Sequence, residues 1–355
     1  MNSEAFPSSL PAARTPPPQE AASLSWGTIG TGGIARHFTE ALQRHTRQSV
    51  VAVGSRSGER AAAFARAAGI GRYYGSYQQL VEAPGVDVVY VASPHSEHRD
   101  HALLAIRAGR HVLVEKAFTR NAVEAREVVA AARQAGVIAM EAMWTRFLPQ
   151  TDVMRQLLAD GALGEIVTVL ADHGQHFAFD AAHRLFAPAL AGGALLDLGI
   201  YPVSLAHLVL GHPDEVAAVG ELALTRVDAQ VSAVLRTVGS QAVVNTTLRA
   251  RTPTTAAIAG TDALLTLSGP FYAPAVLTLE DRRTGRRLER PRDSIAGHLA
   301  LCHEAAHLAS LIAEGAPESP LLPAAETVAI MSTMDSLREA VGARLPGESG
   351  AGSSQ

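Results

Sequence analysis

The residue best placed to do chemistry is Lys116, because it is the one lysine among the 30 lysine and arginine residues of the chain. It directly follows Glu115 and the apolar run 111–114. An ammonium is a compact charge whose pKa is moved by burial and by neighbouring charges, whereas a guanidinium stays charged and needs a wide planar partner. We therefore expect Lys116 to take part in proton chemistry. The alternative is an arginine-rich composition that left one lysine on the solvated surface.

A glycine pattern near the N-terminus suits the binding of phosphates. The string Gly30-x-Gly32-x-x-Ala35 lies between a strand-like run, 24–29, and a helical pattern, 36–44. Small residues at this spacing allow a tight turn, a close approach of the backbone to a pyrophosphate and packing of helix on strand, while the helix N-terminus offers amide donors. The pattern predicts a dinucleotide site, and an ordinary glycine turn is the alternative. The expected contacts are Gly30, Gly32, Gly33, Ile34 and Ala35.

The choice between NAD and NADP depends on residues about 20 positions further along the chain. An acidic side chain there suits the ribose hydroxyl of NAD. This chain has Ser55 and Arg56 instead, and its first carboxylate is Glu59. A guanidinium beside a hydroxyl suits a 2'-phosphate, because it makes charge-assisted bidentate contacts. We therefore expect NADP, with NAD as the second choice. The alternative is a surface arginine at a strand end.

Two further strand ends complete the expected cofactor site. Open α/β sheets bind ligands at the carboxyl ends of their strands, and the strand-like runs 86–92 and 111–114 both end at polar residues. A surface or capping role is the alternative for His98. The expected contacts at these two strand ends are Ser93, Pro94, His95, His98, Glu115 and Lys116.

The alternation of elements along the first half predicts a parallel sheet. Strand-like runs alternate with helical patterns from 24 to 143, which is typical of a doubly wound sheet covered on both faces. The second half has short strand-like runs and then two helical patterns, 299–313 and 324–341. The runs are 166–171, 216–222, 229–238, 242–249, 256–259, 263–267 and 276–280. We expect an α/β fold with an N-terminal Rossmann-type parallel, doubly wound sheet and a C-terminal α+β domain whose open, mostly antiparallel sheet is a meander.

Domain boundaries follow from these patterns. Residues 1–23, rich in proline, alanine and serine, are expected to be a disordered leader. Residues 24–143 form the expected NAD(P)-binding domain, and 144–343 the substrate-binding and dimerisation domain, whose final helix packs back on the nucleotide domain. Residues 344–355 are expected to be a flexible tail. The open sheet face predicts a homodimer or higher homo-oligomer, since exposed sheets tend to be covered.

The composition argues against several classes of protein. A formal net charge of -4 gives no basic surface for nucleic acid or for an acidic membrane. No apolar stretch approaches the roughly 18 uninterrupted residues that a membrane-spanning helix needs. The single cysteine, Cys302, cannot form an intramolecular disulfide and fits a reducing compartment, so we expect a cytoplasmic protein. The expected partner is a small-molecule substrate, without nucleic acid or membrane.

Five motifs in register resemble one family of oxidoreductases. They are Gly30-x-Gly-x-x-Ala35, Ser93-Pro-His-Ser-Glu-His98, Ala108-Gly-Arg-His-Val-Leu-Val-Glu-Lys116, Glu141-Ala-Met-Trp-Thr-Arg-Phe147 and Gly192-Gly-Ala-Leu-Leu-Asp-Leu-Gly-Ile-Tyr201. Over residues 24–343 the chain resembles the glucose-fructose oxidoreductase, inositol dehydrogenase and rhizopine-catabolism (Gfo/Idh/MocA) family. It is most similar to the branch of dimeric dihydrodiol dehydrogenases and NADP-dependent D-xylose dehydrogenases.

The resemblance implies hydride exchange between a nicotinamide and a hydroxyl-bearing carbon of a sugar, polyol or trans-dihydrodiol. It implies that Lys116 is the family's lysine and Tyr201 its acid or base. The family's proline after the lysine is Ala117 here, and this departure leaves the Lys116 backbone less constrained. Asp197, four residues before Tyr201, is expected on the same helical face to orient substrate hydroxyls, with a helix cap as the alternative.

The same proton chemistry can be argued from the side chains alone. Oxidation of a carbinol releases its hydroxyl proton, and a free tyrosine with a pKa of about 10 is mostly in the wrong state to accept it. A nearby ammonium lowers that pKa. We therefore expect Lys116 to assist Tyr201 as acid and base, the alternative being that Tyr201 anchors a helix in the core. Trp144 and Arg146 are expected to line the substrate pocket or, alternatively, to brace the domain crossing.

Two other functions compete with this hypothesis. The string His303-Glu-Ala-Ala-His307 fits the H-E-x-x-H motif of zinc hydrolases, with Glu326 as a candidate third ligand. We expect no metal, because the motif follows a complete nucleotide-binding pattern and short motifs often match by chance. A catalytically silent dinucleotide-binding regulator would keep the glycine turn and lose the proton relay, whereas Lys116 and Tyr201 are both present.

Overall fold

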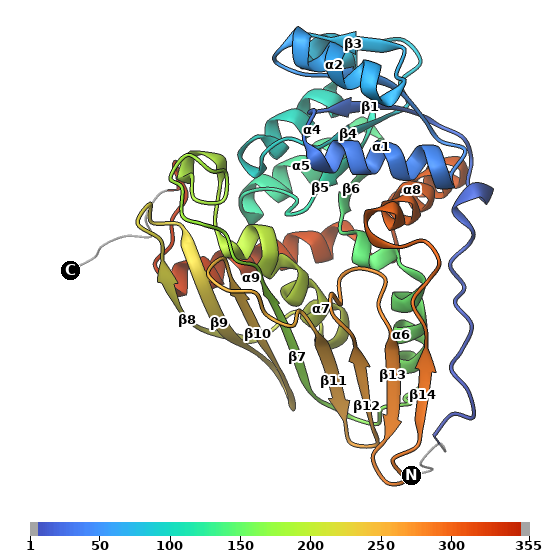
Figure 1. Ribbon diagram of the computed structural model, residues 1–355, viewed down its shortest axis with the longest axis vertical. Coiled ribbons are helices and arrows are strands. Elements are labelled where there is room, and N and C mark those ends of the chain that lie inside the picture. Colours follow the sequence, from blue (N-terminus) through green and yellow to red (C-terminus); the bar gives the residue numbers. More distant parts are fainter. Residues whose placement is uncertain (1–5, 349–355) are drawn as a thin grey trace.

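The computed structural model describes residues 6–348, which form two halves, each built on one sheet (Figure 1). The N-terminal half holds a six-stranded parallel sheet in the order β3-β2-β1-β4-β5-β6. Its strands are β1 (Ser25–Ile29), β2 (Ser49–Gly54), β3 (Arg72–Tyr74), β4 (Val88–Val91), β5 (His111–Glu115) and β6 (Ala139–Ala142). All four residues of β4 are buried, because helices cover both faces of the sheet. The predicted parallel, doubly wound sheet is confirmed.

The strand order of this sheet places two loops side by side. The helices that connect its strands are α1 (Gly33–His45), α2 (Gly58–Ala68), α3 (Tyr77–Val81), α4 (His98–Arg107) and α5 (Ala122–Ala135). The order reverses between β1 and β4, which pair directly with each other. Such a switch point leaves a crevice at the carboxyl ends of the two strands. The glycine loop after β1 therefore lies beside the loop that follows β4.

The C-terminal half is built on an eight-stranded sheet in the order β14-β13-β12-β11-β7-β10-β9-β8. Its strands are β7 (Ile166–Gly174), β8 (Glu215–Leu222), β9 (Asp228–Thr237), β10 (Ser240–Thr247), β11 (Ala256–Gly260), β12 (Ala263–Leu267), β13 (Leu277–Asp281) and β14 (Arg287–Arg290). The predicted mostly antiparallel sheet is confirmed. The simple meander is wrong, because β7 lies in the middle of the sheet and runs parallel to β10. No sequence pattern indicates β14, whose residues are mostly charged.

Helices cover one face of the second sheet and tie the two halves together (Figure 1). Helix α7 (Ile200–Leu210) packs on β7 and β10, and α9 (Ala324–Ala340) packs on α7, β8 and α5. Helix α8 (Cys302–Glu314) and the short helix η6 (Gly297–Leu301) pack against α1. The other described helices are η1 (Pro18–Glu20), η2 (His95–Glu97), η3 (Trp144–Phe147), α6 (Pro149–Ala159), η4 (Pro188–Leu190) and η5 (Leu195–Gly199). One hydrophobic core therefore runs through both halves.

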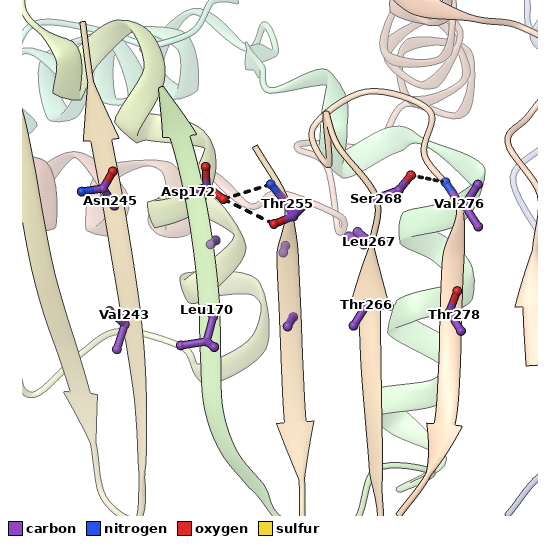
Figure 2. Close-up of a pocket in the computed structure, with 13 residues that line it drawn as sticks. Leu170, Asp172, Val243, Asn245, Thr255, Thr266, Leu267, Ser268, Val276 and Thr278 are labelled. Atoms are coloured by element: carbon purple, nitrogen blue, oxygen red, sulfur yellow. Dashed lines mark hydrogen bonds between the residues drawn. The ribbon is translucent and has the colours of Figure 1, made fainter. Parts of the chain in front are cut away.

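The other face of the eight-stranded sheet carries apolar side chains in the open. Leu170 on β7 and Val243 on β10 are register partners, and both are exposed on this face (Figure 2). Further along β7, Asp172 Oδ1 accepts a hydrogen bond from the Thr255 N–H at 3.1 Å. These residues border a shallow hollow of about 580 Å³. An exposed sheet face of this kind suits contact with another protein surface.

The N-terminal segment is ordered where the structure describes it. Residues 6–23 run alongside the C-terminal half and then join β1 (Figure 1). Arg14 Nη2 pairs with Asp152 Oδ1 of α6 at 3.0 Å, and Ala21 packs against α8. The prediction of a disordered leader is therefore wrong for residues 6–23, because ion pairing and apolar contacts hold a segment whose composition alone indicated disorder. Residues 1–5 of that prediction lie outside the described residues.

The end of the chain differs from its prediction in the same way. Leu345 is buried, and Glu348 Oε1 accepts a hydrogen bond from Arg338 Nη2 on α9 at 2.9 Å. The segment 344–348 is therefore packed rather than a flexible tail. Residues 349–355 of that prediction lie outside the part of the chain that the structure describes.

One helical stretch, Pro188–Leu210, is long and apolar enough to cross a membrane by length and composition, with a mean hydropathy of 1.6. The stretch is not an uninterrupted apolar run, because Asp197 and His207 lie within it, so it does not contradict the prediction that no uninterrupted apolar run approaches about 18 residues. In addition, 83% of its apolar window is buried inside the protein, as in the core helix of a folded domain. This stretch carries Asp197 and Tyr201 into the centre of the molecule.

Candidate active site

A cavity of about 750 Å³ lies where the two halves meet, at the carboxyl ends of β1, β4 and β5. Residues expected at the cofactor that line this cavity are Gly30, Gly32, Gly33, Ile34, Ser55, Arg56, Ser93, Pro94, His95, His98, Glu115 and Lys116. Trp144, Asp197 and Tyr201, expected at the substrate, line the same cavity. The structure thus brings residues from both halves of the chain to one site.

The glycine loop leaves room for a phosphate group. Helix α1 begins at Gly33, and its N-cap residue, Gly32, has no side chain that could bond to the first amides of the helix. A Cβ added at Gly32 or Gly33 would meet nothing within 4 Å, whereas one at Gly30 would lie 2.6 Å from the Ala92 oxygen. Gly30 also has a φ of +106°, which favours glycine. The loop therefore has room for the pyrophosphate of a dinucleotide. Ala35, which was also expected at the cofactor, is buried in the core and does not line the cavity.

Two arginines line the cavity next to the carboxyl end of β2. Arg56 follows Ser55, whose hydroxyl oxygen accepts a hydrogen bond from the Ser57 N–H at 3.2 Å. Arg60 lies in the first turn of α2, and Ser57 caps that helix. The sequence analysis did not identify Arg60 as a cofactor contact. Its position four residues after Arg56, at the start of the following helix, could have indicated it. Arg56 and Arg60 together offer two positive charges to a phosphate in this part of the cavity.

Lys116 reaches across the cavity from the end of β5 to the helical segment η5. Its ammonium donates to the Asp197 carbonyl oxygen at 2.7 Å and lies 3.4 Å from Asp197 Oδ1. The ammonium also lies 5.1 Å from the centroid of the Tyr201 ring, within the range of a cation–π contact. The Lys116–Ala117 peptide bond is cis. Lys116 and Tyr201 therefore meet in one cavity, with the ammonium over the face of the ring.

Asp197 forms ion pairs with two cationic side chains, Lys116 and Arg184. Its Oδ1 accepts a hydrogen bond from Arg184 Nη1 at 3.0 Å, in addition to the contact with Lys116. Burial opposes ionisation, but the charges of Lys116 and Arg184 outweigh it and hold the pKa of Asp197 below its usual range. The helix cap is supplied by Asp228, whose Oδ2 accepts the Leu195 N–H at 2.6 Å. The alternative that Asp197 is a helix cap is therefore wrong.

Tyr201 lies in the first turn of α7 with its hydroxyl against the indole of Trp144. Trp144 Nε1–H donates to the Tyr201 oxygen at 3.1 Å. Burial raises the pKa of Tyr201 well above its usual value, and the hydrogen bond from Trp144 opposes this only in part. The expected lowering of this pKa by Lys116 is therefore wrong, because the ammonium faces the ring while the buried oxygen has lost its hydration. At neutral pH the hydroxyl is protonated and is a proton donor.

An aromatic wall that the sequence did not indicate surrounds the Tyr201 ring. Tyr272 stacks on Tyr201 with ring centroids 4.4 Å apart, and the His173 ring lies 4.6 Å from that of Tyr272. His298 stacks on Trp144 at 5.8 Å. Burial lowers the pKa of His173 to about 4, so its imidazole is neutral at neutral pH. Because these residues come from β7, from the loop before β13 and from η6, no local sequence pattern connects them.

The two histidines of the loop after β4 support the cavity through backbone contacts. His98 Nδ1 lies 2.9 Å from the Ala117 oxygen, and its Nε2 lies 2.8 Å from the Ser93 oxygen. His95 Nε2 lies 3.2 Å from the Lys116 oxygen. Burial lowers the pKa of His95 to about 3 and that of His98 to about 4. The surface role considered for His98 is wrong, since this ring joins the loop to the backbone beside Lys116.

Glu115 lines the cavity and also forms a buried hydrogen bond with Tyr90. The Tyr90 hydroxyl donates to Glu115 Oε1, and the Lys116 N–H donates to Glu115 Oε2 at 3.2 Å. Burial raises the pKa of Glu115 to about 7, although Tyr90 and Lys116 both favour its carboxylate. A group that titrates near neutral pH therefore stands next to Lys116.

Arg146 points away from the cavity. Its side chain is 1% exposed, its Nε donates to Ser204 Oγ at 3.0 Å, and its Nη2 donates to Glu326 Oε1 at 2.6 Å. In a 3₁₀ turn, residues two apart lie on different faces, so Trp144 reaches the cavity while Arg146 does not. The prediction that Arg146 binds substrate is therefore wrong, and the structure supports the alternative that it braces the crossing between the halves.

The H-E-x-x-H motif has other partners in the folded chain. Among residues 6–348, no group of three histidine, cysteine, aspartate or glutamate side chains is placed to hold a metal ion. Glu326, the candidate third ligand, pairs with Arg146. His307 Nε2 lies 2.8 Å from Ser319 Oγ, and Glu304 is fully buried. The zinc alternative therefore has no set of ligands in the described residues.

The fold and this cavity define a two-domain, NAD(P)-dependent oxidoreductase. A helix N-terminus at a glycine turn lines the same cavity as Lys116, which follows β5, and Tyr201, which comes from α7 of the C-terminal half. The chain belongs to the GFO/IDH/MocA family. Residues 24–143 match the family described as "Oxidoreductase family, NAD-binding Rossmann fold", and residues 151–266 match the "GFO/IDH/MocA C-terminal domain". The predicted family is confirmed.

Similar proteins agree with this membership. The trans-1,2-dihydrobenzene-1,2-diol dehydrogenase of Sus scrofa is 35% identical over 336 residues, which are 91% of this chain and 98% of that protein. The Homo sapiens dehydrogenase of the same name is 34% identical over 331 residues, with 91% and 98% coverage. The structure of KijD10, a 3-ketoreductase from Actinomadura kijaniata, in complex with NADP and TDP-benzene, has a TM-score of 0.79 and 28% identity, covering 90% of this chain and 98% of that one. The predicted similarity to dihydrodiol dehydrogenases is confirmed.

Proposed function

We propose that this enzyme transfers hydride between NADP(H) and a hydroxyl-bearing carbon of a sugar, polyol or trans-dihydrodiol. The observation that carries the proposal is the placement of Lys116 and Tyr201 in the cavity that the glycine loop opens. The names of the relatives support the substrate class, because they are dehydrogenases of a dihydrodiol. The aromatic wall around Tyr201 also suits the apolar face of a sugar ring or of a cyclic diol.

In the proposed mechanism, the chain's own residues handle the proton of the reacting oxygen. A bound nicotinamide supplies or accepts the hydride. Tyr201, kept neutral by its raised pKa, gives its proton to a carbonyl oxygen that is being reduced, and the reverse transfer serves oxidation. Lys116, held by Asp197, places positive charge where the oxygen becomes negative. General acid–base catalysis of this kind contributes about 10²- to 10⁴-fold in rate.

The arginines at the end of β2 support NADP rather than NAD as the cofactor. Arg56 and Arg60 both line the cavity, and neither position offers the carboxylate that would suit an unmodified ribose. A 2'-phosphate would receive charge-assisted hydrogen bonds from two guanidiniums. The structure of KijD10, which contains NADP, supports the same preference.

A substrate panel read at the absorbance of NADPH tests the proposal. Purified enzyme with NADP⁺ is offered aldoses, inositols, other polyols and trans-dihydrodiols, and with NADPH the corresponding carbonyl compounds. We expect turnover with at least one group, and higher kcat/KM with NADP⁺ than with NAD⁺. NADPH binding without turnover of any compound would instead favour the alternative, a catalytically silent regulator.

The open sheet face supports a homodimer or higher homo-oligomer. Leu170, Val243 and Leu264 are apolar and exposed on the second sheet, where no described helix covers them. Light scattering coupled to size-exclusion chromatography tests this assembly, and Leu170→Glu should shift it toward monomer. A cytoplasmic location also stays a proposal, supported by the single buried Cys302, which has no cysteine partner.

A further inference from the structure

A second cavity, of about 480 Å³, adjoins the active-site cavity inside the C-terminal half. The two cavities share His173, Gln175 and Tyr272 as lining residues. These three side chains therefore form the boundary between two adjacent hollows.

The boundary offers a hydrogen-bond acceptor to such a ligand. His173 Nδ1 lies 3.2 Å from the Leu198 carbonyl oxygen, so Nδ1 carries the proton and donates it there. His173 Nε2 is then an acceptor, and the Gln175 amide nitrogen, 3.0 Å away, donates to it. The Gln175 side-chain oxygen takes no part in this contact, and as an acceptor it suits a substrate hydroxyl.

The charge of the second cavity contrasts with that of the whole protein. Within residues 6–348 no carboxylate lines it, although the chain has a net charge of -4. Arg251 and His176 line it at the exposed surface. Arg249 pairs with Glu221, whereas no ion pair among the described residues uses Arg251. A guanidinium without an acidic partner at the edge of a polar hollow suits an anion, because it makes charge-assisted hydrogen bonds.

The backbone beside Arg251 is held in an unusual conformation. Thr254, which lines the second cavity, has a φ of 56°, which a β-branched residue rarely adopts. Asp172 fixes it, since Asp172 Oδ2 accepts the Thr254 N–H at 2.9 Å. Residues held in such conformations cluster at ligand-binding positions. The wall of the cavity is therefore shaped by specific contacts.

We propose that the second cavity is a subsite for an anionic group, a phosphate or a carboxylate, on the sugar or polyol whose carbinol reacts between Lys116 and Tyr201. This inference rests on the proposed function. Arg251 pairs with the anion, and Gln175 accepts a hydrogen bond from a hydroxyl between the anion and the reacting carbon. Phosphorylated or acidic sugars are therefore better substrates than their neutral counterparts.

Three matched substrates test the subsite: a neutral aldose, the same aldose with a terminal phosphate, and the corresponding uronate. We expect kcat/KM with NADP⁺ to be about tenfold higher for at least one anionic member, mainly through KM. Arg251→Gln should remove this advantage and leave the neutral aldose unchanged, and Arg251→Lys should restore part of it. Arg249→Gln is the matched control, because its guanidinium pairs with Glu221 outside both cavities. The phosphate and uronate arms identify which anion is preferred.

The outcomes separate this inference from the proposed function. Equal kcat/KM for neutral and anionic substrates, or an equal loss for all three in Arg251→Gln, overturns the subsite while the oxidoreductase activity stands. Absence of turnover with every compound overturns the proposed function. In that case calorimetric titration of the NADPH-bound enzyme with the aldose phosphate still decides the subsite, since binding that Arg251→Gln abolishes supports it and unchanged or absent binding overturns it.

Discussion

The Lys116 ammonium lies 5.1 Å from the centroid of the Tyr201 ring, and the Asp197 carbonyl oxygen holds it there at 2.7 Å. The charge therefore faces the ring, while the Tyr201 hydroxyl is bonded to the indole of Trp144. Because the two groups are held by different partners, either can be removed while the other keeps its position. The charge and the hydroxyl can thus be tested separately.

Lys116→Met removes the charge and keeps a long unbranched side chain. We expect kcat to fall by about 10²-fold or more, because no other lysine exists in the chain to stabilise a developing oxyanion. Asp197 keeps Arg184 as its ion-pair partner, so the fold should be retained. Fluorescence titration with NADPH should show little change in Kd. Wild-type turnover in this variant would contradict the role proposed for Lys116.

Tyr201→Phe removes the hydroxyl and keeps the ring under the ammonium. We expect kcat to fall by about 10²- to 10⁴-fold, since the proton donor is lost while the aromatic contacts with Tyr272 and Lys116 remain. Circular dichroism checks that the fold is intact. Tyr73→Phe is the control, because Tyr73 is exposed on β3 and should leave kcat unchanged. Equal activities of the two variants would rule out Tyr201 as the acid.

The sequence alone predicted the elements that depend on residues close together in the chain. The glycine turn and the strand-helix alternation around it follow from neighbouring residues, and both sheets were predicted in kind. The central place of β7 was not, because it depends on pairing with β10 and β11, which are distant in sequence. The same reason explains why His173, Tyr272 and His298 were missed as cavity residues. Arg146 was wrongly predicted to bind substrate because the sequence does not show which way its side chain points in η3. The pKa of Tyr201 was wrongly predicted to be lowered because the sequence does not show how deeply its hydroxyl is buried.

Arg60→Ala and Arg56→Ala should weaken NADP binding selectively. Loss of one charge-assisted contact to a 2'-phosphate should raise the Kd of NADP⁺ by about 10- to 100-fold and leave that of NAD⁺ almost unchanged. Isothermal titration calorimetry with both nucleotides measures the ratio. Arg66→Ala is the matched control, since Arg66 lies exposed in the last turn of the same helix and does not line the cavity. Equal effects on both nucleotides would argue against recognition of the 2'-phosphate.

Glu141→Gln should change how stability depends on pH. Burial raises the pKa of Glu141 to about 7 from 4.5, although the Phe118 N–H donates to its Oε1 at 3.1 Å. Between about pH 4.5 and 7 the Glu141 carboxyl therefore releases its proton in the unfolded chain and keeps it in the folded protein, so the contribution of Glu141 to the free energy of unfolding falls as pH rises. Glutamine keeps the acceptor and does not titrate. Relative to the wild type, the variant should gain up to about 3 kcal/mol between pH 4.5 and pH 8.

Urea unfolding at these two pH values measures that difference for Glu141→Gln. Glu339→Gln, an exposed position in the last turn of α9, is the control and should follow the wild type. The same change in unfolding free energy between the two pH values in the wild type and in Glu141→Gln would contradict a raised pKa of Glu141 in the folded state.

Arg146→Met should reduce stability and leave substrate recognition intact. The guanidinium is buried and bonded to Ser204 and Glu326, so its removal leaves polar partners without a charge at the crossing between the halves. Breaking a buried ion pair costs about 3–5 kcal/mol, and partial exposure of Glu326 places this case near the lower figure. Chemical denaturation measures the loss, with the exposed Arg133→Met as the control. Because Arg146 does not line the cavity, KM at a temperature where both proteins are folded should be unchanged. A raised KM at unchanged stability would mean instead that Arg146 contacts the substrate.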